Sequence, residues 1–292
     1  MKILHIVPGL ENIGNGMSVA AHLIADVAGD DLMDARRFAI GERDIKTCNE
    51  VWVHSCWLPS VLLSCRRVVN AGKPLVCMPH GNLDPVRLRY HAWKKRLVGP
   101  IERWCLRRCD RIVATCEAEK GWIQAYLGKH CPLVEVTDIK RFFKLPTSEA
   151  GALPSDRPLH LLYLGRRHPL KGLEYLEKAI RQIQNTSASP RLRVRMVSSA
   201  FGEEKEKIWD WCDVLVLPTL SDNFGLVVAE ALERGKRVIT TDGAPAWGDG
   251  NDYGGRLVYL RGYRDGTPEV RIKKLHSSIS NLLKRCSYGD SL

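Results

Sequence analysis

Two short stretches of the sequence carry polar residues whose types and spacing could do chemistry. The first, YLGRRHPLKGLE at 163–174, places Arg166 and Lys171 directly after an apolar run. The pattern predicts a buried strand that ends at Gly165 and a helix whose first turn contains Lys171 and Gly172. A guanidinium and an ammonium near a helix N-terminus suit a diphosphate. Either cation alone would be ordinary surface charge, but the spacing makes this stretch a candidate phosphate site.

The second stretch, SDNFGLVVAE at 221–230, follows the strongly apolar run DVLVLPTL. Its polar start is typical of a helix cap, so we expect a helix to begin near Phe224 to Leu226. Gly225 lets a ligand approach the backbone, and the free N–H groups of the first turn can bind sugar hydroxyls or phosphate oxygens. Capping explains Asp222 but does not explain Glu230, which interrupts an apolar helix. Two carboxylates about two turns apart can hydrogen-bond two polyol portions of one ligand.

The elements that must position these residues are short apolar runs separated by helical or turn segments. This rhythm is typical of parallel βαβ units. The expected strands are 2–7, 36–41, 50–56, 74–80 and 111–116 in the first half, and 160–165, 191–199, 213–219 and 237–242 in the second. The expected helices are 18–28, 170–184, 224–235 and 270–286.

A stretch with three prolines, KLPTSEAGALPSDRP at 144–158, separates the two halves and predicts a linker. We therefore predict an α/β protein of two Rossmann-like domains, 1–147 and 148–292, that face a central cleft, with a C-terminal helix. Ligands of such sheets bind beyond the carboxyl ends of the strands, which is where both polar stretches fall.

These motifs closely resemble those of the nucleotide-sugar-dependent glycosyltransferases of the GT4 group, which have the GT-B fold. The resemblance rests on LGRRHPLKG and LPTLSDNFGLVVAEAL, and it extends to PHGNLDP at 79–85, GNGMS at 14–18 and TTDGAPAWGD at 240–249. It covers most of the chain. The arginine–lysine pair and the acidic motif are its specific parts, whereas the glycine loop alone would be a weak signal.

The resemblance implies a role for each candidate residue. Arg166 and Lys171 would neutralise the departing diphosphate, and His80 would hydrogen-bond the sugar near the reacting carbon. Asp222 would hold the transferred sugar, and these four residues form the predicted catalytic set. The predicted donor-binding set contributes backbone groups and one ribose-binding acid: Gly14, Gly16, Asn223, Phe224, Gly225, Leu226 and Glu230.

By the same resemblance we expect a retaining transferase that moves a hexose or N-acetylhexosamine from a nucleotide-diphosphate donor, with a UDP-sugar as the expected donor. No Asp-x-Asp triplet occurs in the sequence, so side-chain cations are expected to replace a metal, and no cofactor is expected. The acceptor would be a growing bacterial surface glycan, lipid-linked, of the O-antigen, lipopolysaccharide or capsule kind. The segment between Gly165 and Asp213 is short for the family, which predicts a shortened second domain.

A basic stretch at 87–111 predicts attachment to an anionic membrane surface. The chain carries 44 Lys and Arg against 33 Asp and Glu, a net charge of +11, which suits an anionic partner. The stretch would form a cationic helical face with tryptophan anchors, interrupted near Gly99 and Pro100. A solvated basic face is the alternative. The membrane-side residues predicted here are Arg87, Arg89, Trp93, Lys94, Lys95, Arg96 and Trp104. The N-terminal apolar run is too short for a signal peptide, so we expect a cytoplasmic protein on the inner face of the cell membrane.

Other functions are weighed against this one. A basic nucleic-acid-binding protein would explain the charge but would leave Asp222 and Glu230 without a role. A catalytically weak or inactive nucleotide-sugar-binding homologue would keep the motifs without turnover. A Rossmann dehydrogenase, a P-loop enzyme and a GxSxG hydrolase each lack their glycine motif here. The ten cysteines show no zinc spacing and indicate buried thiols in a reducing compartment.

Overall fold

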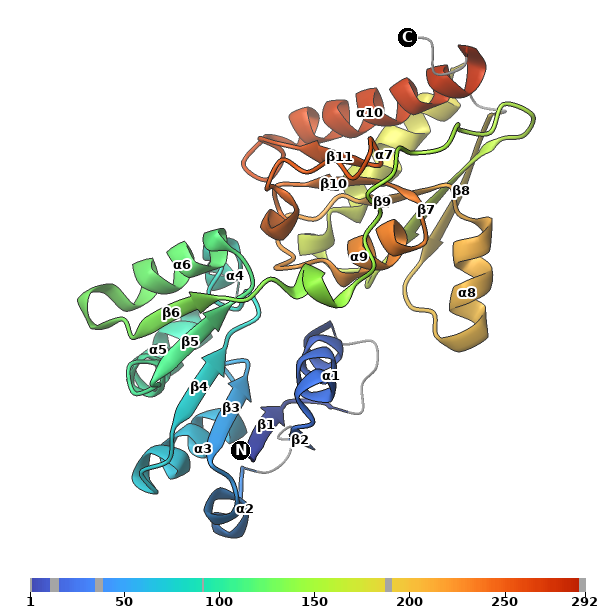
Figure 1. The fold of residues 1–292 in the computed structure, drawn as a ribbon. Helices are drawn as coiled ribbons and strands as arrows, with labels where there is room; N and C mark the ends of the chain where they lie inside the picture. The colour runs from blue at the N-terminus through green and yellow to red at the C-terminus, as the bar shows by residue number, and fades with distance from the viewer. Residues whose placement is uncertain (1, 11–15, 35–38, 91, 187–190, 289–292) are drawn as a thin grey trace. The chain divides into compact units, whose positions relative to one another are not determined.

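The computed structural model describes residues 2–10, 16–34, 39–90, 92–186 and 191–288. The chain divides into two compact units, Met1–Phe142 and Phe143–Leu292 (Figure 1). Each unit holds one parallel sheet with helices between its strands, so the predicted α/β class with two Rossmann-like halves is confirmed. The division predicted from the sequence lies between residues 147 and 148.

Unit 1 is built on a six-stranded sheet in the order β2-β1-β3-β4-β5-β6, with every neighbouring pair parallel. Its strands are β1 (Ile3–Val7), β2 (Asp31–Asp34), β3 (Glu50–His54), β4 (Leu75–Met78), β5 (Arg111–Ala114) and β6 (Leu133–Val136). Its helices are α1 (Gly16–Ala28), α2 (Glu42–Thr47), α3 (Pro59–Asn70), α4 (Pro85–Arg89), α5 (Ala92–Leu106) and α6 (Glu117–Leu127), with the 3₁₀ turns η1 (Gly128–His130) and η2 (Ile139–Phe142).

Unit 2 is built on a five-stranded parallel sheet in the order β11-β10-β9-β7-β8. Its strands are β7 (Leu159–Leu164), β8 (Leu192–Val197), β9 (Val214–Leu217), β10 (Arg237–Thr241) and β11 (Leu257–Leu260). Its helices are α7 (Leu173–Gln184), α8 (Gly202–Trp211), α9 (Leu226–Glu233) and α10 (Pro268–Tyr288), with the 3₁₀ turns η3 (Pro169–Lys171) and η5 (Pro245–Trp247). Each unit has its own apolar core, because the central strands of both sheets are buried along nearly their whole length.

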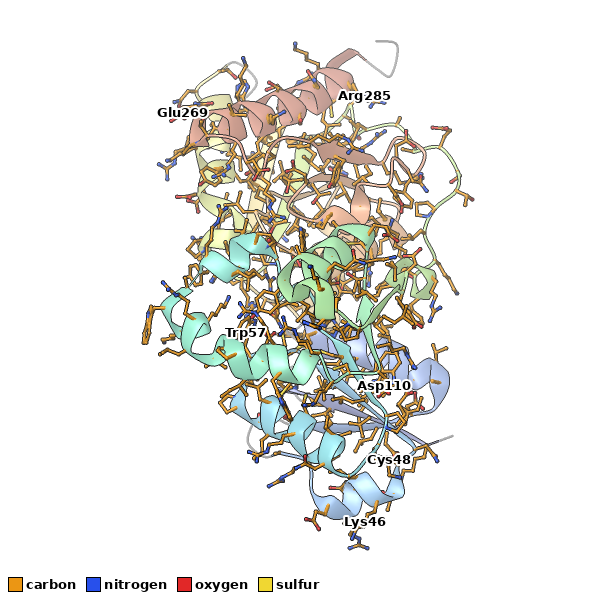
Figure 2. The ribbon with its side chains drawn as sticks, turned by 90° about the vertical axis from the view of Figure 1, so that its left-hand side faces the viewer. Lys46, Cys48, Trp57, Asp110, Glu269 and Arg285 are labelled. Atoms are coloured by element: carbon orange, nitrogen blue, oxygen red, sulfur yellow. The ribbon has the colours of Figure 1, made fainter. Side chains whose placement is uncertain are left out.

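The expected C-terminal helix is α10, which packs along α7 (Figure 1). Leu275, Ile279 and Leu282 bury one face of α10 in the core of unit 2. Figure 2 marks Glu269 near its start and Arg285 near its end, where their charges complement the helix dipole. None of the described helices combines the length and the apolar character that crossing a membrane requires.

Two sequence-based expectations for unit 1 are wrong. The predicted strand 36–41 is not a strand over Ala39–Gly41, and residues 36–38 lie outside the described residues. The strand beside β1 at the edge of the sheet is instead β2, a four-residue strand in which an aspartate stands at each end of Leu32 and Met33, so it gives little apolar signal. Ile40 is buried all the same: its N–H donates to Ser64 Oγ at 3.0 Å, and its carbonyl accepts from Arg67 Nη1 at 2.7 Å.

The second correction concerns α5, which runs without interruption through Gly99 and Pro100. A proline inside a helix removes one backbone hydrogen bond. The helix nevertheless continues, since Gly99, Cys105 and Leu106 on its inner face are buried against the rest of the unit.

The stretch 144–158 contains no helix or strand, but unit 2 holds it firmly. The guanidinium of Arg256 donates to the carbonyls of Ser148 and Glu149 at 2.5 and 3.0 Å, and Arg237 Nη2 donates to the carbonyl of Gly151 at 2.9 Å. The segment therefore packs as part of unit 2 rather than running as a free linker.

Candidate functional site

The first polar stretch folds into a tight turn between β7 and α7. His168 Nδ1 accepts a hydrogen bond from the N–H of Leu170 at 3.2 Å, which caps η3. Gly172 then turns the chain into α7 with φ of 65°. A Cβ atom at this position would lie 2.0 Å from the carbonyl oxygen of Pro218. Only glycine fits both the backbone angle and the close approach, so Lys171 is held directly against the segment that follows β9.

One carbonyl joins the two polar stretches. The oxygen of Leu170 accepts hydrogen bonds from the N–H groups of Leu220 and Ser221, at 2.8 and 3.3 Å, and from Thr219 Oγ1 at 3.0 Å. These donors all follow β9, whereas the acceptor follows β7, the neighbouring strand in the sheet. The stretches predicted from sequence to act together are therefore one packed unit at the carboxyl ends of two adjacent strands.

A third segment, the end of β10 and the loop after it, holds the acidic motif in place by hydrogen bonds. The N–H of Asp222 donates to the carbonyl of Gly243 at 2.7 Å, and Thr241 Oγ1 donates to the carbonyl of Thr219 at 2.5 Å. A Cβ atom on Gly243 would lie 2.1 Å from that same carbonyl oxygen. The stretch TTDGAP thus fixes the backbone from which the Asp222 side chain projects.

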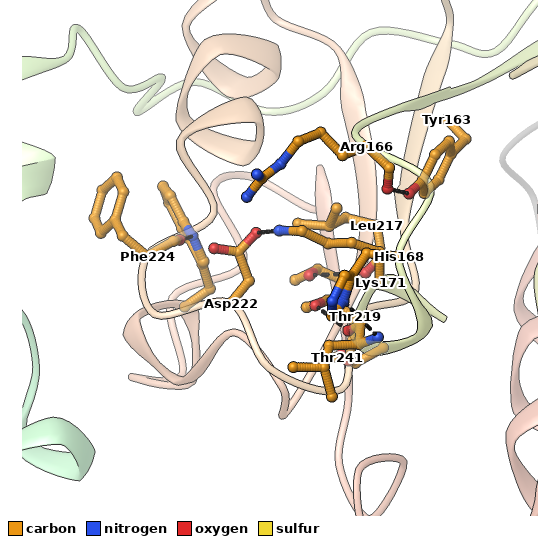
Figure 3. A network of polar contacts seen from close by, with 12 residues as sticks. Tyr163, Arg166, His168, Lys171, Leu217, Thr219, Asp222, Phe224 and Thr241 are labelled. Atoms are coloured by element: carbon orange, nitrogen blue, oxygen red, sulfur yellow. Dashed lines mark hydrogen bonds and ion pairs between the residues drawn. The ribbon is translucent and has the colours of Figure 1, made fainter. Parts of the chain in front are cut away.

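The side chains of Lys171 and Asp222 form an ion pair, and Arg166 lies close to it (Figure 3). Both members of the pair are mostly buried, with 16% and 21% of the side chain exposed. Arg166 is exposed, and in Figure 3 its side chain extends toward Asp222. Within the described ranges, no carboxylate forms an ion pair with its guanidinium. The site thus presents two cations and one acid at a single place.

A buried tyrosine fixes the backbone beneath Arg166. The hydroxyl of Tyr163 donates to the carbonyl of Arg166 at 3.0 Å. Burial, together with the charge of Asp222, raises the pKa of Tyr163 to about 12, so the hydroxyl keeps its proton and remains a donor.

The acidic motif opens α9 as expected. Gly225 is the N-terminal cap, with φ of 68° and ψ of 63°, and Leu226 is the first helical residue. Phe224 is buried, stacks against Phe143 and accepts a hydrogen bond on its carbonyl from Trp247 Nε1. Asn223 is buried as well. Leu226, the first residue of α9, lies only four positions after Asp222, so the first N–H groups of the helix lie close to that acid along the chain.

Glu230 lies further along α9 and has a partner that the sequence analysis missed. Its carboxylate forms an ion pair with Lys205 of α8 at 2.8 Å, with about a quarter of the lysine side chain exposed. Lys205 lies 25 positions before Glu230 and stands in no recognisable motif, so the sequence gave no signal of this pairing.

In unit 1, His80 stands in a turn after β4 with φ of 52°, an uncommon angle for a residue with a side chain. Glu119 of α6 fixes this turn by accepting hydrogen bonds from the N–H of Gly81 at 2.5 Å and from the N–H and hydroxyl of Thr115, both at 2.8 Å. Burial, with the charge of Arg87, lowers the pKa of His80 to about 3, so His80 is neutral near pH 7.

The glycine loop is only partly described. Gly16 is the exposed first residue of α1, whereas Gly14 lies outside the described residues. Among the described residues, no group of three or more His, Cys, Asp or Glu side chains could hold a metal ion.

The basic stretch forms α4 and α5. Arg87 and Arg89 lie on α4, and Trp93, Lys94, Lys95, Arg96 and Trp104 lie on α5. Lys95 differs from the prediction: it turns inward, its ammonium donates to the carbonyl of Arg87, and it lies 5.5 Å from the ring centre of Trp57.

The exposed face of α5 is more apolar than the sequence analysis expected. Trp93, Leu97 and Ile101 follow one another at helical spacing, and 64%, 71% and 58% of each residue is exposed. Trp104 continues this stripe and is capped by the guanidinium of Arg108 at 4.4 Å from the ring centre. We call the four residues Trp93, Leu97, Ile101 and Trp104 the α5 stripe.

Each half of the chain matches a family model of glycosyltransferases. A family model described as Glycosyltransferase Family 4 matches residues 49–136, and one described as Glycosyl transferases group 1 matches residues 158–261. No curated protein matches the sequence.

Solved structures share the fold along nearly the whole chain. Sucrose-phosphate synthase from Thermosynechococcus elongatus has a TM-score of 0.64 at 14% identity, over 98% of this chain and 91% of that one. HepE from Anabaena in complex with UDP has a TM-score of 0.60 at 14% identity, over 98% and 93%. The trehalose-phosphate synthase of Burkholderia xenovorans in complex with glucose-6-phosphate has a TM-score of 0.64 at 9% identity, over 98% and 92%.

The fold and the two family matches define a glycosyltransferase of the GT-B class. Within that class, the chain belongs to the GT4-type family, as the motifs in both halves of the sequence indicated.

Proposed function

We propose that this enzyme is a retaining, metal-independent glycosyltransferase that uses a UDP-sugar to extend a bacterial surface glycan on a lipid-linked acceptor. The transferred group is a hexose or an N-acetylhexosamine. The observation that carries the proposal is the meeting of Arg166, Lys171 and Asp222 at the carboxyl ends of β7 and β9, beside the start of α9. Two cations suit the diphosphate, and the acid with the first N–H groups of α9 suits the sugar.

In this proposal the two cations are the main catalytic groups. As the bond between the anomeric carbon and the diphosphate breaks, the leaving oxygen takes the bonding pair and gains negative charge. Arg166 and Lys171 stabilise that charge, and a rigid backbone holds both in place before the reaction begins. Preorganised charge of this kind lowers a barrier by several kcal/mol, on the order of 3 for one group.

The remaining residues orient the donor. Asp222 accepts hydrogen bonds from hydroxyls of the transferred sugar, and the N–H groups after Gly225 face the same portion of the ligand. Glu230 accepts hydrogen bonds from the ribose, with Lys205 holding its carboxylate. His80 contacts the sugar near the anomeric carbon. The choice of UDP draws on a relative with the same fold, HepE from Anabaena, which was solved with UDP and with UDP and glucose.

A thermal-shift panel tests the donor site. UDP, GDP, ADP and their common sugars are added with EDTA present and again with Mg²⁺. A ligand at about a hundred times its dissociation constant adds roughly 2.7 kcal/mol of stability. We expect UDP and one UDP-sugar to raise the midpoint equally with and without metal, and Lys171→Ala and Glu230→Ala to abolish the shift.

Lys178→Ala is the matched control, because Lys178 is an exposed lysine on α7. It should respond to UDP as the wild type does. A nucleotide shift that requires Mg²⁺ contradicts metal independence. If no nucleotide raises the midpoint, the donor site is absent or inactive. Anomeric configuration is read by NMR of the product, and an inverted product contradicts the retaining mechanism.

We propose that α5 binds the enzyme to the anionic inner face of the cell membrane. The α5 stripe offers tryptophan and aliphatic side chains to the lipid, and the exposed Lys94 and Arg96 flank it. This composition is typical of a helix that lies in the membrane interface. It would bring the enzyme to a lipid-linked acceptor.

Vesicle sedimentation tests this surface. Binding is expected with vesicles that contain anionic lipid, but not with purely zwitterionic ones, and salt should weaken it. Leu97→Ser should reduce binding about tenfold or more, because burying a leucine contributes about 1.5–3 kcal/mol. Leu133→Ser, at a comparably exposed leucine on β6, should have no effect. Equal loss in both variants contradicts a specific α5 surface.

A further inference from the structure

Three histidines and one aspartate of unit 1 form a continuous line of hydrogen bonds. Asp30 Oδ2 lies 3.3 Å from His5 Nε2, and His5 Nδ1 lies 2.9 Å from His54 Nε2. His54 Nδ1 then lies 2.8 Å from His80 Nε2. Each interior ring thus uses both of its nitrogens within the line, and His80 uses one.

The sheet topology sets the order of the four residues. Asp30 directly precedes β2, His5 lies on β1, His54 ends β3 and His80 follows β4. The strand order β2-β1-β3-β4 therefore places them side by side across the sheet. A buried structural histidine needs only a local hydrogen-bond partner. This line instead spans four neighbouring strands and ends at His80, the predicted sugar contact.

The rings are neutral at working pH. Burial lowers the pKa of His5 and lowers that of His54 well below its usual value, and the mutual effect of neighbouring rings acts on His54 in the same direction. His80 is neutral as well, as described above. The nearby charged groups are Asp30 and Glu50, which act on His5, and Arg87, which acts on His80.

A neutral imidazole has one N–H donor and one bare acceptor nitrogen, so a line of such rings has a direction. The Asp30 carboxylate only accepts, which places the proton of His5 on Nε2 and leaves its Nδ1 bare. His54 must then donate from Nε2 to His5, and its own bare Nδ1 must accept from Nε2–H of His80. The nitrogen left bare at the end of the line is Nδ1 of His80.

We propose that Asp30, His5 and His54 are positioning residues that hold His80 in its Nε2–H tautomer, so that Nδ1 accepts a hydrogen bond from a hydroxyl of the bound sugar. The ligand contact rests on the proposed function, whereas the tautomer does not. The line fixes the ring plane of His80 and leaves Nδ1 as an acceptor, so His80 selects for a sugar hydroxyl that donates a hydrogen bond. A sugar position that lacks the hydroxyl, or carries only an acceptor there, is discriminated against.

Backbone strain at the same place supports a functional role. His80 has φ of 52°, and Ser55, the residue after His54, has φ of 87°. Side-chain-bearing residues adopt such angles at a cost, and the strain tends to gather where a precise geometry is used. Asn82 Nδ2 donates to Ser55 Oγ at 3.1 Å and so links the two strained turns.

NMR of the full chain labelled with ¹⁵N-histidine tests the proposal. The ring nitrogens of His80, assigned with His80→Gln, should show a protonated Nε2 and a bare Nδ1 in the wild type. In Asp30→Asn, the amide can donate to His5 Nε2, which permits the reversed line, so His80 should lose its single tautomer although two rings separate it from the substitution. Asp31→Asn is the matched control, because Asp31 is an exposed neighbour that pairs with Lys2, and it should change nothing.

Each outcome decides a separate point. A wild-type His80 that carries its proton on Nδ1, or an Asp30→Asn spectrum with an unchanged His80, overturns the positioning role. If Asp30→Asn does not fold, the wild-type tautomers of His5 and His54 decide, since both must also be Nε2–H.

The sugar contact has its own test. Adding UDP-glucose should shift the His80 Nδ1 signal, and UDP alone should not. If the thermal panel shows that UDP-glucose binds and Nδ1 does not move, the sugar contact is refuted and the tautomer result still stands. If no nucleotide binds at all, the proposed function fails instead.

Discussion

Neutralising Asp222 should strengthen the binding of UDP while weakening the binding of a UDP-sugar. In the structure, the ammonium of Lys171 is paired with the Asp222 carboxylate. A diphosphate must draw Lys171 away from that acid and must also tolerate the acid's negative charge nearby. Asp222→Asn removes both obstacles and keeps the size of the side chain. The transferred sugar, in contrast, loses an ionised hydrogen-bond acceptor.

The size of the effect follows from the burial of the pair. Its side chains are 16% and 21% exposed, so the pair is neither fully solvated nor fully buried. Exposed pairs contribute about 0.2–1 kcal/mol, and breaking a buried one costs about 3–5 kcal/mol. An intermediate value of about 1–2 kcal/mol corresponds to a gain in UDP affinity of roughly 5- to 30-fold.

Isothermal titration calorimetry with UDP and with the active UDP-sugar measures both affinities. The ratio of the UDP-sugar affinity to the UDP affinity should fall in Asp222→Asn, with the UDP affinity itself rising. Glu174→Gln is the control, because it removes one exposed acid from the first turn of α7 and should leave the ratio unchanged. Weaker UDP binding in Asp222→Asn would refute the idea that Asp222 competes with the diphosphate for Lys171.

Three further predictions concern stability and donor binding. Gly172→Ala should destabilise unit 2 by about 3 kcal/mol or more and abolish the UDP thermal shift, because its Cβ would meet the Pro218 carbonyl in a left-handed backbone. Lys205→Ala should lower UDP affinity several-fold by releasing Glu230, and calorimetry should show partial rescue in Lys205→Arg. Glu102 is fully buried, and burial raises its pKa to about 7 from 4.5, so its folded form holds a proton that the unfolded chain releases. The wild type should therefore lose about 3 kcal/mol of stability between pH 4.5 and 7, and urea unfolding of Glu102→Gln should show no such loss.

The outcomes that contradict these predictions are distinct. A Gly172→Ala protein with unchanged stability would mean that the turn after η3 relaxes freely. UDP binding unchanged in Lys205→Ala would mean that Glu230 needs no support. A Glu102→Gln protein with the pH slope of the wild type would assign that slope to other groups.

The central strands were predictable from sequence, whereas three of the four edge strands were not. β1, β3, β4, β7, β9 and β10 are buried on both faces and read as apolar runs. β2 and β6 are the two edges of the first sheet, and β8 and β11 are those of the second; of the four, only β8 was predicted. Acidic residues interrupt the apolar runs of β2 and β6, and the apolar run of β11 is only four residues long. Helix α8 was not predicted either. Ile208 and Trp209 are its only buried side chains, so the sequence shows little apolar periodicity there.

The site shows the same division between local and long-range information. Arg166, Lys171, Asp222 and Glu230 stand in short motifs whose residue types reveal their chemistry. Lys205, the partner of Glu230, stands in no such motif. It lies on another helix, and nothing in the neighbouring sequence distinguishes it from an ordinary surface lysine. The line from Asp30 to His80 is also invisible in the sequence, since it depends on the order in which strands are placed in the sheet.

The carbonyl of Leu170 has a consequence for protein engineering. It accepts hydrogen bonds from three groups that lie some fifty residues away in the chain, so the loop after β7 and the loop after β9 form one interlocked module. Exchanging only one of these loops with a related enzyme would leave mismatched donors and acceptors under the cations. Chimeras designed to change donor preference should therefore carry 165–172 and 218–226 together, and single-loop exchanges should lose stability that the paired exchange regains.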